Sequence, residues 1–407
     1  MKSNYKPLGK YIQPVVGRNN DLGDLPLMGL SIQKKFIPSI ANTIGTDMST
    51  YRTIYKNQFA FGPVTSRNGD KITIALFNDY DKALISQAYI PFKVKDNNEL
   101  DTEYLMMWFR RPEFDRYARF KSHGSAREIF DWEEMCNTLL PVPHIDKQKE
   151  IVKEYNTIQN RIALNQQLIQ KLEETAQAIY KEWFVEFEFP DENGKPYKSN
   201  GGALVWNEEL QKELPLGWKA EKLGNIIESF SKTHSFKKDK LIFFNTSDIL
   251  DGELLHNDFM SIYDMPGQAK KQISNGDILF SEIRPNNKRY AIVRLEADDY
   301  VVSTKLMVLR RKSNNFSAYR LYQFLTEESF ITELQQSAEG RSGTFPQITF
   351  EEDLELKPFL IADNRVENIW NRFLNSSYDL IFSKKDETKK LTELINLLLS
   401  KLATIEN

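Results

Sequence analysis

The feature that most constrains the fold of this chain is an internal duplication. Four short segments of the first half recur, in the same order, 215 to 217 residues later. The matching segments are 5–12 and 220–227, 84–86 and 301–303, 104–109 and 319–324, and 141–150 and 358–367. Each match is weak alone, but the constant order and nearly constant offset indicate two copies of one unit within the 407 residues.

Both copies predict the same succession of elements. A stretch of mixed pattern comes first, with β-rich runs bounded by Gly, Asn and Asp at 71–77, 277–280 and 300–302. Short helices are predicted over 102–109 and 318–324, and prolines then precede a long helix in each copy. The sequence therefore predicts two similar domains of mixed α and β structure, each followed by a helix.

The first long helix is predicted over residues 147–184, which contain neither Gly nor Pro. Its apolar residues recur at steps of three and four, with one polar position in the middle. The seam consists of Ile151, Tyr155, Ile158, Ile162, Asn165, Ile169, Leu172 and Ile179. Such a seam needs a partner helix, and a buried Asn can fix its register. A core helix of a globular bundle is the alternative, although about 57 Å of helix exceeds what a domain core needs.

The second long helix is predicted from about residue 364 to 403, again without Gly or Pro. Its expected seam consists of Trp370, Phe373, Leu380, Leu391, Leu394 and Leu398. The polar stretch 383–387 interrupts this seam and is expected to face solvent or a partner. Because the helices have equal length and a whole domain separates them in sequence, we expect them to pair antiparallel as a coiled coil.

Composition narrows the class of protein. The 41% hydrophobic and 27% charged residues are ordinary for a globular chain, and 54 Lys and Arg nearly balance 57 Asp and Glu. This balance excludes a chain-wide basic surface for nucleic acid but allows a local one. The single cysteine, Cys136, rules out an internal disulfide. With no apolar run of about 18 residues and no leader pattern, a cytoplasmic protein without a membrane segment is expected.

Common catalytic signatures are missing from the sequence. It contains no Gly-rich phosphate loop, no G-x-S-x-G, no H-E-x-x-H and no [DN]-P-P-aromatic tetrapeptide. Glu355-Leu356-Lys357 has the E-x-K shape of some nucleases but lacks a suitable upstream Asp, so a partly exposed strand is the favoured interpretation. We expect no catalytic residue, no metal and no bound cofactor.

Polar and basic clusters give a stronger signal because they recur in both copies. Residues 65–71 and 284–289 each form a predicted loop after a strand. Arg and Asn side chains in such loops can bind guanine and adenine edges bidentately in the major groove. The candidate DNA contacts are Ser66, Arg67, Asn68 and Lys71 in the first copy and Arg284, Asn286, Asn287 and Lys288 in the second.

A second pair of clusters precedes the long helices. Residues 121–127 and 340–347 contain Gly, Ser and basic residues, which suits contacts with phosphate groups. The candidates are Lys121, Ser122, His123 and Arg127, and Arg341, Ser342, Thr344 and Gln347. Lys and Arg also concentrate in 110–127 and 284–312, so a local positive surface is predicted. A solvated polar turn explains any one loop, but recurrence at matching positions favours DNA contacts.

These features together resemble the specificity subunit of type I restriction–modification systems. The segments that carry the resemblance are 214–218 (Leu-Pro-Leu-Gly-Trp) with 222–224, 276–281 leading to Arg284-Pro285, 341–344 before 347–349, 141–143 leading into 148–152, and 168–187. Each motif has low specificity by itself, but the ordered set is specific and covers essentially the whole chain. The first copy departs from the pattern, with no Leu-Pro-x-Gly-Trp opening and with Gly62-Pro63-Val64-Thr65-Ser66-Arg67 replacing the Ser-x-x-Arg-Pro loop.

The resemblance implies a mixed α+β fold. Two similar α/β target-recognition domains would be separated by two long antiparallel coiled-coil helices and related by a pseudo-twofold internal repeat. The expected boundaries are 1–145 for the first target-recognition domain, 146–186 for the first spacer helix, 187–217 for a linker, 218–361 for the second domain and 362–407 for the second spacer helix. Trp218 is expected to anchor the start of the second domain.

The resemblance also implies a non-catalytic, DNA-binding subunit. Each domain would recognise one half of a bipartite, asymmetric site in double-stranded DNA. The helices would set the half-site separation and dock two modification (methyltransferase) subunits, which would bind S-adenosylmethionine. Restriction (translocase/nuclease) subunits would join them in a bacterial or archaeal cytoplasm. Two alternatives stay open: a stand-alone methyltransferase or nuclease acting on DNA, and a coiled-coil scaffold without a DNA role.

Overall fold

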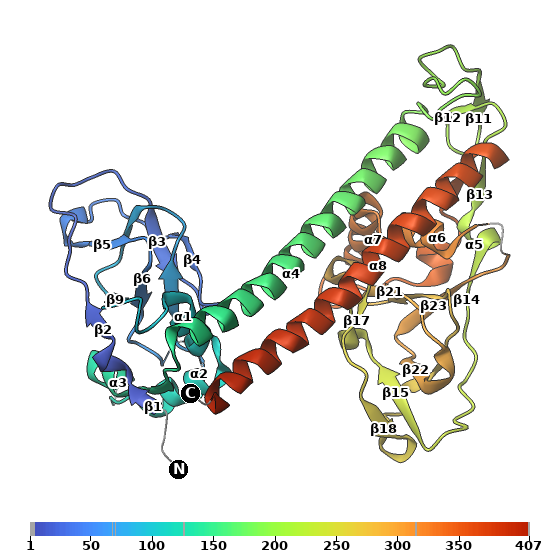
Figure 1. Ribbon diagram of the computed structural model, residues 1–407. Coiled ribbons are helices and arrows are strands. Elements are labelled where there is room, and N and C mark those ends of the chain that lie inside the picture. The colour runs from blue at the N-terminus through green and yellow to red at the C-terminus, as the bar shows by residue number, and fades with distance from the viewer. Residues whose placement is uncertain (1–4, 67, 70, 125–126, 314–315, 406–407) are drawn as a thin grey trace. The chain divides into compact units, whose positions relative to one another are not determined.

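The computed structural model describes residues 5–66, 68–69, 71–124, 127–313 and 316–405. These residues form two compact units (Figure 1). Unit 1 comprises residues 1–167 and 384–407, and unit 2 comprises residues 168–383. Each unit therefore contains one globular domain and a part of each long helix.

The first globular domain, in unit 1, is built on two sheets. One is antiparallel throughout, with the order β2 (Ile12–Pro14), β9 (Ile90–Val94), β6 (Gln58–Phe61) and β7 (Ile74–Phe77). The other has the order β4 (Phe36–Pro38), β3 (Leu27–Leu30), β8 (Lys82–Ile85) and β5 (Arg52–Tyr55), and its β3–β8 pair is parallel. A further antiparallel pair joins β1 (Tyr5–Pro7) to β10 (Leu139–Pro141).

The second globular domain, in unit 2, repeats these sheets. Its antiparallel sheet has the order β14 (Ile227–Ser229), β23 (Leu306–Arg311), β20 (Ile278–Ser281) and β21 (Tyr290–Ile292). The mixed sheet has the order β18 (Phe259–Ser261), β15 (Lys240–Phe244), β22 (Tyr300–Ser303) and β19 (Ala269–Gln272), again with a parallel central pair. β13 (Lys219–Lys222) pairs with β24 (Pro358–Ile361). The matching orders and directions confirm the duplication.

Unit 2 also has two small hairpins without a counterpart among the described strands of unit 1. They are β16 (Ile249–Leu250) with β17 (Glu253–Leu254), and β11 (Leu204–Asn207) with β12 (Lys212–Pro215). The second of these lies in the linker between the copies, upstream of β13.

Helices follow the strands in the same way in both domains. α1 (Thr102–Arg110) and α6 (Ala318–Leu325) confirm the short helices that the sequence predicts. Asp101 and Ser317 cap them, because each side chain accepts a hydrogen bond from backbone N–H groups of the first turn. A second helix follows in each case, α2 (Pro112–Phe120) and α7 (Glu328–Arg341), which the sequence analysis did not predict. α3 (Trp132–Asn137) and α5 (Leu223–Ile226) are shorter additions.

The E-x-K segment is a turn rather than a strand. It follows the π-helical residues Phe350–Leu354, and β24 begins afterwards, at Pro358. Lys357 forms an ion pair with Glu333. The strand predicted over 355–357 was therefore wrong, because the π-helical turn extends into residues that alternate like a strand.

The first long helix, α4, extends over Ile145–Tyr180 and continues as π-helix over Lys181–Val185. The second, α8, extends over Asn364–Lys401. In unit 1, Ile151, Tyr155 and Ile158 of α4 pack in one core with Ile395 and Leu399 of α8. The segments run antiparallel (Figure 1), since Arg161, further along α4, contacts Glu387, which precedes Ile395 on α8. No described helix is both long and apolar enough to cross a bilayer.

In unit 2 the same two helices pair through aromatic residues. Trp370 on α8 is 0% exposed and packs against Tyr180, Trp183 and Phe184 at the end of α4, with ring centroids 5.7–6.4 Å apart. Arg320 of α6 is buried beside this cluster, with its guanidinium 4.4 Å from the centroid of Phe184. The pairing is again antiparallel.

The residues of the predicted α4 seam are buried or partly buried, whereas two residues of the predicted α8 seam are exposed. Leu380 and Leu394 are 39% and 44% exposed, and the adjacent residues Ile381 and Ile395 are buried instead. The buried residues on α8 include Val366, Trp370, Leu374, Ser377, Ile381, Ile395 and Leu399. Hydropathy does not distinguish adjacent Leu and Ile residues, and the polar stretch 383–387 provides no apolar residue that fixes the register. The predicted buried positions Leu380 and Leu394 were therefore wrong by one residue.

In the polar stretch 383–387, Ser383 and Asp386 are exposed, as expected, whereas Lys384 and Glu387 contribute to the helix pair in unit 1. Glu387 accepts hydrogen bonds from Arg161 of α4, at 2.7 Å, and from Lys384, at 2.6 Å. One turn further along α4, Asn165 is 3% exposed and donates to Thr388 at 3.3 Å. The interruption is therefore a polar layer between the helices.

Trp218 anchors the start of the second domain, as predicted. Its ring stacks on Phe189 of the linker, with centroids 4.8 Å apart, and packs against Phe184 at the end of α4. Gly217, with φ of 85°, supplies the left-handed turn immediately before it. The linker is therefore folded back onto its neighbouring helix by aromatic contacts.

Candidate nucleic-acid interface

The predicted loops occupy equivalent positions in the two domains. Residues 62–73 connect β6 to β7, and residues 282–289 connect the corresponding strands β20 and β21. The other two segments follow the second helix of each domain, at 121–129 after α2 and at 342–348 after α7. We call 62–73 with 121–129 the first loop pair, and 282–289 with 342–348 the second loop pair.

The two segments of the first loop pair lie side by side. Val64 and Ile129 form a β-bridge, and the Thr65 N–H donates to the Glu128 carbonyl at 3.0 Å. The Thr65 hydroxyl also donates to Ser122 Oγ at 2.8 Å. Segments more than fifty residues apart in sequence thus form one surface.

The second loop pair is joined by an equivalent bridge. Ile283 pairs with Gln347, and the Arg284 N–H donates to the Pro346 carbonyl at 3.1 Å. The Arg284 side chain donates from Nη2 to the carbonyl of Thr344 at 3.2 Å. The structure therefore brings together, in each domain, the two clusters that the sequence identified separately.

The second loop pair has an unusual backbone. Arg284 and Lys288 have φ values of 47° and 53°, and they flank a 3-10 turn at Pro285–Asn287. Such left-handed residues cost of order 1–3 kcal/mol and cluster at sites where conformation serves function. The turn raises the side chains of Asn286, Asn287 and Lys288 to the surface.

The candidate side chains differ in what they contact. Those classified as exposed are Ser66, Lys71, His123, Arg127, Arg284, Asn286, Asn287, Lys288, Arg341 and Thr344. Asn68 donates to the Val64 carbonyl at 3.1 Å, and Ser122 donates to the Ala118 carbonyl at 2.7 Å. Lys121 lies 3.7 Å from Glu134. Ser342 accepts a hydrogen bond from the Phe345 N–H, and Arg67 lies outside the described residues.

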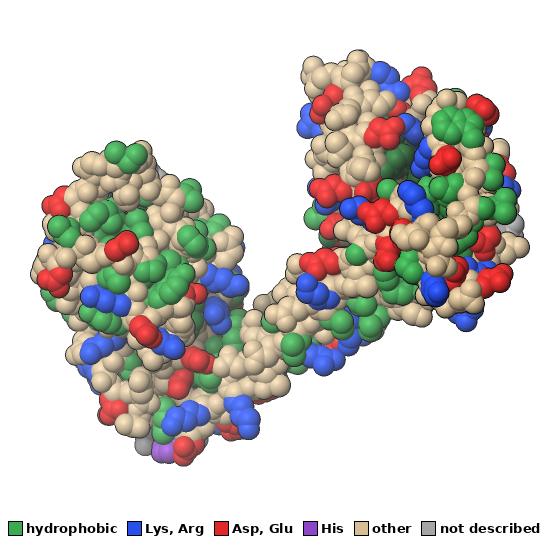
Figure 2. Space-filling view, turned by 90° about the horizontal axis from the view of Figure 1, so that it is seen from above, with side chains coloured by type: hydrophobic (Ala, Val, Ile, Leu, Met, Phe, Trp, Pro, Cys, Tyr) green, Lys and Arg blue, Asp and Glu red, His purple; other side chains and the backbone are tan. Residues whose placement is uncertain are grey.

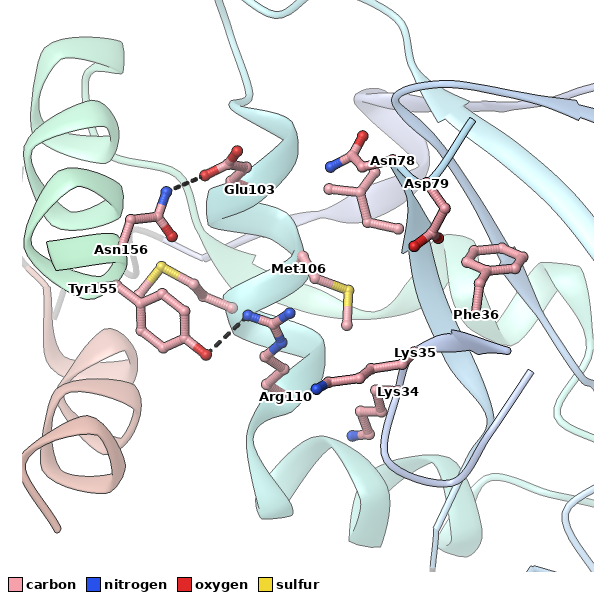
Figure 3. Close-up of a pocket in the computed structure, with 12 residues that line it drawn as sticks. Lys34, Lys35, Phe36, Asn78, Asp79, Glu103, Met106, Arg110, Tyr155 and Asn156 are labelled. Atoms are coloured by element: carbon pink, nitrogen blue, oxygen red, sulfur yellow. Dashed lines mark hydrogen bonds between the residues drawn. The ribbon is translucent and has the colours of Figure 1, made fainter. Parts of the chain in front are cut away.

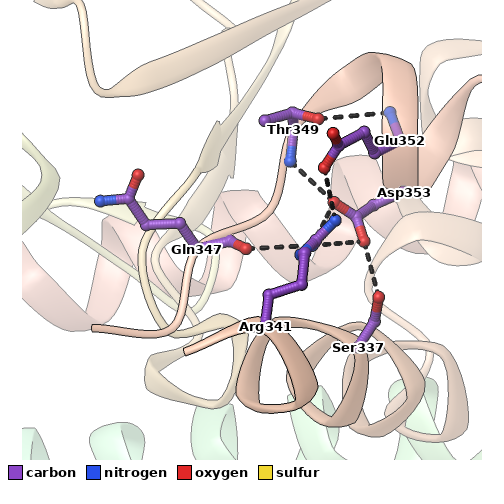
Figure 4. Close-up of polar contacts among 6 residues, drawn as sticks. All are labelled: Ser337, Arg341, Gln347, Thr349, Glu352 and Asp353. Carbon is purple, nitrogen blue, oxygen red and sulfur yellow. Dashed lines mark hydrogen bonds and ion pairs between the residues drawn. The ribbon is translucent and has the colours of Figure 1, made fainter. Parts of the chain in front are cut away.

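The Arg341 side chain is 39% exposed, but its guanidinium is held by contacts within the protein. Figure 4 shows its guanidinium among Asp353, Glu352 and the backbone of Gln347. The distances are 2.7 Å to each of the two carboxylates and 3.0 Å to the carbonyl. These contacts indicate that Arg341 shapes the loop 342–348, which is an alternative to the predicted phosphate contact.

Buried polar residues of α2 and α7 support the loops, and the sequence analysis missed them. Asp115 Oδ1 accepts from the Ile72 N–H, and Gln335 Oε1 accepts from the Asn286 N–H, both at 3.2 Å. Asp115 also pairs with the buried Lys34 at 2.8 Å, whose pKa burial lowers. These residues lie more than forty positions from the loops that they hold, so no local motif reveals them.

Several of the basic side chains of 110–127 are engaged in contacts within the fold. Arg111 is buried and stacks over Trp108 at 4.3 Å, and Arg110 donates to the Tyr155 hydroxyl at 2.8 Å. Arg119 pairs with Glu128. In Figure 2, basic and acidic side chains are interspersed on the face shown, in agreement with the balanced composition.

A cavity of about 300 Å³ lies beside α4 in unit 1 (Figure 3). Arg110, Tyr155 and Asn156 line it from the helices, and Lys35 and Asp79 line it from the sheet side. Unit 2 has a larger cavity, of about 570 Å³, between the corresponding elements α6, β21 and α8. Neither cavity contains a cluster of metal-ligating side chains, and none was found among the described residues.

Comparison with known proteins identifies the family. The family described as "Type I restriction modification DNA specificity domain" matches residues 2–174 and 215–357, one match in each copy. The HindI type I restriction enzyme specificity subunit of Haemophilus influenzae is 44% identical over 135 residues, which are 33% of this chain and 29% of that protein. The MjaIX type I specificity subunit of Methanocaldococcus jannaschii is 21% identical over 378 residues, 88% of this chain and 84% of that protein.

A solved structure supports the same fold. The S subunit of the type I restriction–modification system of M. genitalium superimposes with a TM-score of 0.59 at 11% identity, over 99% of this chain and 96% of that one. Two family matches, one for each structural repeat, account for most of the sequence. The chain therefore belongs to the type I restriction–modification DNA specificity family, as a specificity subunit rather than a catalytic one.

Proposed function

We propose that each globular domain binds one half of a bipartite site in double-stranded DNA through its loop pair. The observation that carries this proposal is the recurrence of the loop pairs. Two domains of equal topology each join a hairpin loop to the segment after the second helix, and polar side chains gather there in both. Because the side chains themselves differ between the copies, the two half-sites have different sequences.

The side chains divide into two kinds of contact. Asn286 and Asn287 offer amides that can bind the adenine edge, and Arg284 offers a guanidinium for guanine. Lys71, Arg127 and Lys288 are exposed cations suited to phosphate groups, which position a protein on DNA without reading sequence. Loss of a base contact should relax one position of one half-site, whereas loss of a phosphate contact should weaken binding to every sequence.

The paired helices fix the separation of the half-sites and bind partners. A helical connection between two recognition modules relates their spacing in the protein to half-site spacing along the DNA, as the subunit arrangement does in dimeric DNA-binding proteins. We propose that two modification subunits dock on these helices, bind S-adenosylmethionine and methylate adenines. Restriction subunits with translocase and nuclease activity complete the complex in the cytoplasm. Further phosphate contacts from the partners compensate for the balanced charge of this chain.

Mapping of methylated adenines tests the proposal. Cells that produce this chain with its modification subunits should show one bipartite methylated motif across the genome. Exchange of residues 1–145 for those of a relative should replace one half of the motif and leave the other half and the spacing intact. A motif that changes in both halves, or in neither, would contradict the assignment of one half-site to each domain.

A binding measurement distinguishes the proposed function from that of a stand-alone methyltransferase. The isolated chain should not bind S-adenosylmethionine in calorimetric titration, whereas the complex with modification subunits should. Tight binding of the cofactor by the chain alone would reject the proposed division of labour. The scaffold alternative predicts no sequence-specific protection of DNA by the complete complex.

A further inference from the structure

Arg341 ends α7 where residues 342–348 of the second loop pair begin, and its side chain, 39% exposed, contacts Gln347, Glu352 and Asp353 (Figure 4). One guanidinium nitrogen, Nη2, contacts both Asp353 oxygens at 2.7 Å and the Gln347 carbonyl at 3.0 Å. The other, Nη1, contacts Glu352 at 2.7 Å. One side chain therefore connects the end of a helix, the far end of the loop and the π-helical turn after it.

Asp353, the centre of this network, is a fixed support. Its side chain is 1% exposed, and its two oxygens accept hydrogen bonds from the Ser337 hydroxyl and from the Thr349 N–H, each at 2.8 Å, in addition to Arg341. A buried carboxylate with so many donors has a well-defined orientation. The geometry of Arg341 is thus imposed by residues that lie beneath the loop.

The charges of this network do not favour a direct contact with DNA. One guanidinium faces two carboxylates, so the group carries a net charge of −1 (+1 from Arg341, −2 from Glu352 and Asp353). A phosphate would meet repulsion from Glu352, which is exposed beside Arg341. To reach a base edge, the guanidinium would have to leave Asp353 as an unpaired buried charge, which is costly.

The first domain closes its loop differently at the equivalent place. His123 and Ile129 lie 218 residues before Arg341 and Gln347 (341 − 123 = 347 − 129 = 218), and they exchange two backbone hydrogen bonds of 3.1 and 2.9 Å. In the second domain, the Arg341 side chain donates to the backbone of Gln347 instead. The second loop therefore depends on one side chain for a closure that the first loop obtains from its backbone.

We propose that Arg341 is a positioning residue for recognition of the second half-site. Through Asp353 it holds residues 342–347 in the conformation in which Thr344 and the adjoining Arg284 meet DNA, and it makes no DNA contact itself. This inference rests on the proposed function and replaces the phosphate contact predicted for Arg341.

The test compares methylation motifs of complexes that contain Arg341→Gln, Asp353→Asn or both substitutions. The second half of the motif should lose specificity at one or more positions, by roughly tenfold or more, while the first half stays unchanged. Asp353→Asn should reproduce Arg341→Gln, and the double variant should be no worse than either, because both act through one network. Arg341→Lys keeps the charge but not the forked geometry, so it should have an intermediate effect.

Arg310→Gln provides the matched control. Arg310 pairs bidentately with the buried Asp277 of the same domain, at 2.8 and 2.7 Å, away from the loop pair. It should lower the melting temperature and leave both half-sites unchanged. Equal relaxation in Arg310→Gln would mean that general destabilisation, not positioning, explains the effect and would overturn the inference.

Three further outcomes decide between the hypotheses. If Arg341→Gln relaxes the motif but Asp353→Asn leaves it sharp, Arg341 contacts DNA directly and the positioning role is rejected. If neither substitution changes the motif, the loop does not depend on the network. A wild-type complex without any bipartite motif would overturn the proposed function as well, so the two failures are distinguishable.

Discussion

Asn165 of α4 donates a hydrogen bond to Thr388 of α8, 3.3 Å away, in the helix pair of unit 1 and one turn from the Arg161–Glu387 contact. A buried amide in such a seam favours one register, because a shifted register leaves it unpaired. We expect Asn165→Leu to increase the free energy of unfolding by about 1 kcal/mol, as apolar replacements of buried polar groups often do. Thermal unfolding of the variant tests this.

The exposed Asn160, on the same helix, is the matched control. Asn160→Leu should change stability by less than about 0.5 kcal/mol, the usual range for surface positions. A loss of stability in Asn165→Leu larger than in Asn160→Leu would show that the Asn165 hydrogen bond outweighs the gain from apolar packing.

The contacts of Glu387 with Arg161 and Lys384 predict how the thermal stability of the protein depends on pH. Hydrogen bonds from Arg161 and then Lys384 lower the pKa of Glu387 to about 2, from 4.5. A carboxyl with a lowered pKa in the folded state stabilises the protein above pH 4.5, and this contribution disappears as the pH falls from 4.5 toward 2. Glu387→Gln should therefore melt below the wild type at pH 6, and the difference should shrink between pH 4.5 and 3. A constant difference would contradict the assigned pKa.

Trp370 should be the most costly truncation in the aromatic cluster of unit 2. The side chain is fully buried between Trp183, Phe184 and Phe373. Trp370→Ala should cost about 3–5 kcal/mol, because it removes packing and leaves a cavity. Trp206, 53% exposed on the linker hairpin, is the matched control and should cost much less in the same urea titration. Similar losses for the two tryptophans would indicate that the cluster is not a unit of stability.

Gly9 and Gly224 occupy equivalent positions of the repeat and should both resist substitution. A Cβ on Gly9 would lie 2.8 Å from Cys136 Cβ and 3.3 Å from its backbone, and one on Gly224 would lie 2.6 Å from Glu355 Cγ and 3.2 Å from its backbone carbonyl. Gly9→Ala and Gly224→Ala should therefore each cost about 1–3 kcal/mol. Gly340→Ala, in open space on α7, should instead stabilise by about 0.4–1 kcal/mol. Calorimetric melting of all three variants checks the order.

Substitutions of Lys288 and Asn287 should have different effects on DNA binding by the complete complex, one through charge and the other through sequence recognition. Lys288→Asn keeps a residue that tolerates positive φ, so the turn should persist. We expect it to weaken binding to all sequences and to reduce the slope of log K against log[salt] by about 1. Asn287→Ala should leave that slope unchanged and relax one base position. Fluorescence titrations at several salt concentrations, on the mapped site and on a mismatched duplex, distinguish the two effects.

The repeat and the long helices were predictable because they depend on order and periodicity. A constant offset of 215 to 217 residues located equivalent strands, and the absence of Gly and Pro located α4 and α8. The register of α8 was not predictable, since Leu380 and Ile381 are equally apolar and their burial depends on the partner helix. The pairing of the loops was not predictable either, because the bridges between Val64 and Ile129 and between Ile283 and Gln347 join distant segments.

For single residues of the candidate site, too, the sequence could not predict features that depend on contacts with distant residues. Exposed Asn287 and Lys288 have the surroundings expected of a DNA contact, but composition alone could not distinguish them from Arg341, whose charge is compensated by Asp353. Asp115 and Gln335 support the loops from helices that the sequence analysis did not predict.

The division of α8 between the two units has a consequence for how the chain is made. Residues 168–383, which form unit 2, are continuous in sequence. The core of unit 1, in contrast, includes Ile395 and Leu399 from the last part of α8, and Leu402 directly after it. Contacts across so many residues form late, and domains generally fold as units during synthesis. On the ribosome, the second recognition domain should therefore reach its native state before the first, although it is translated later.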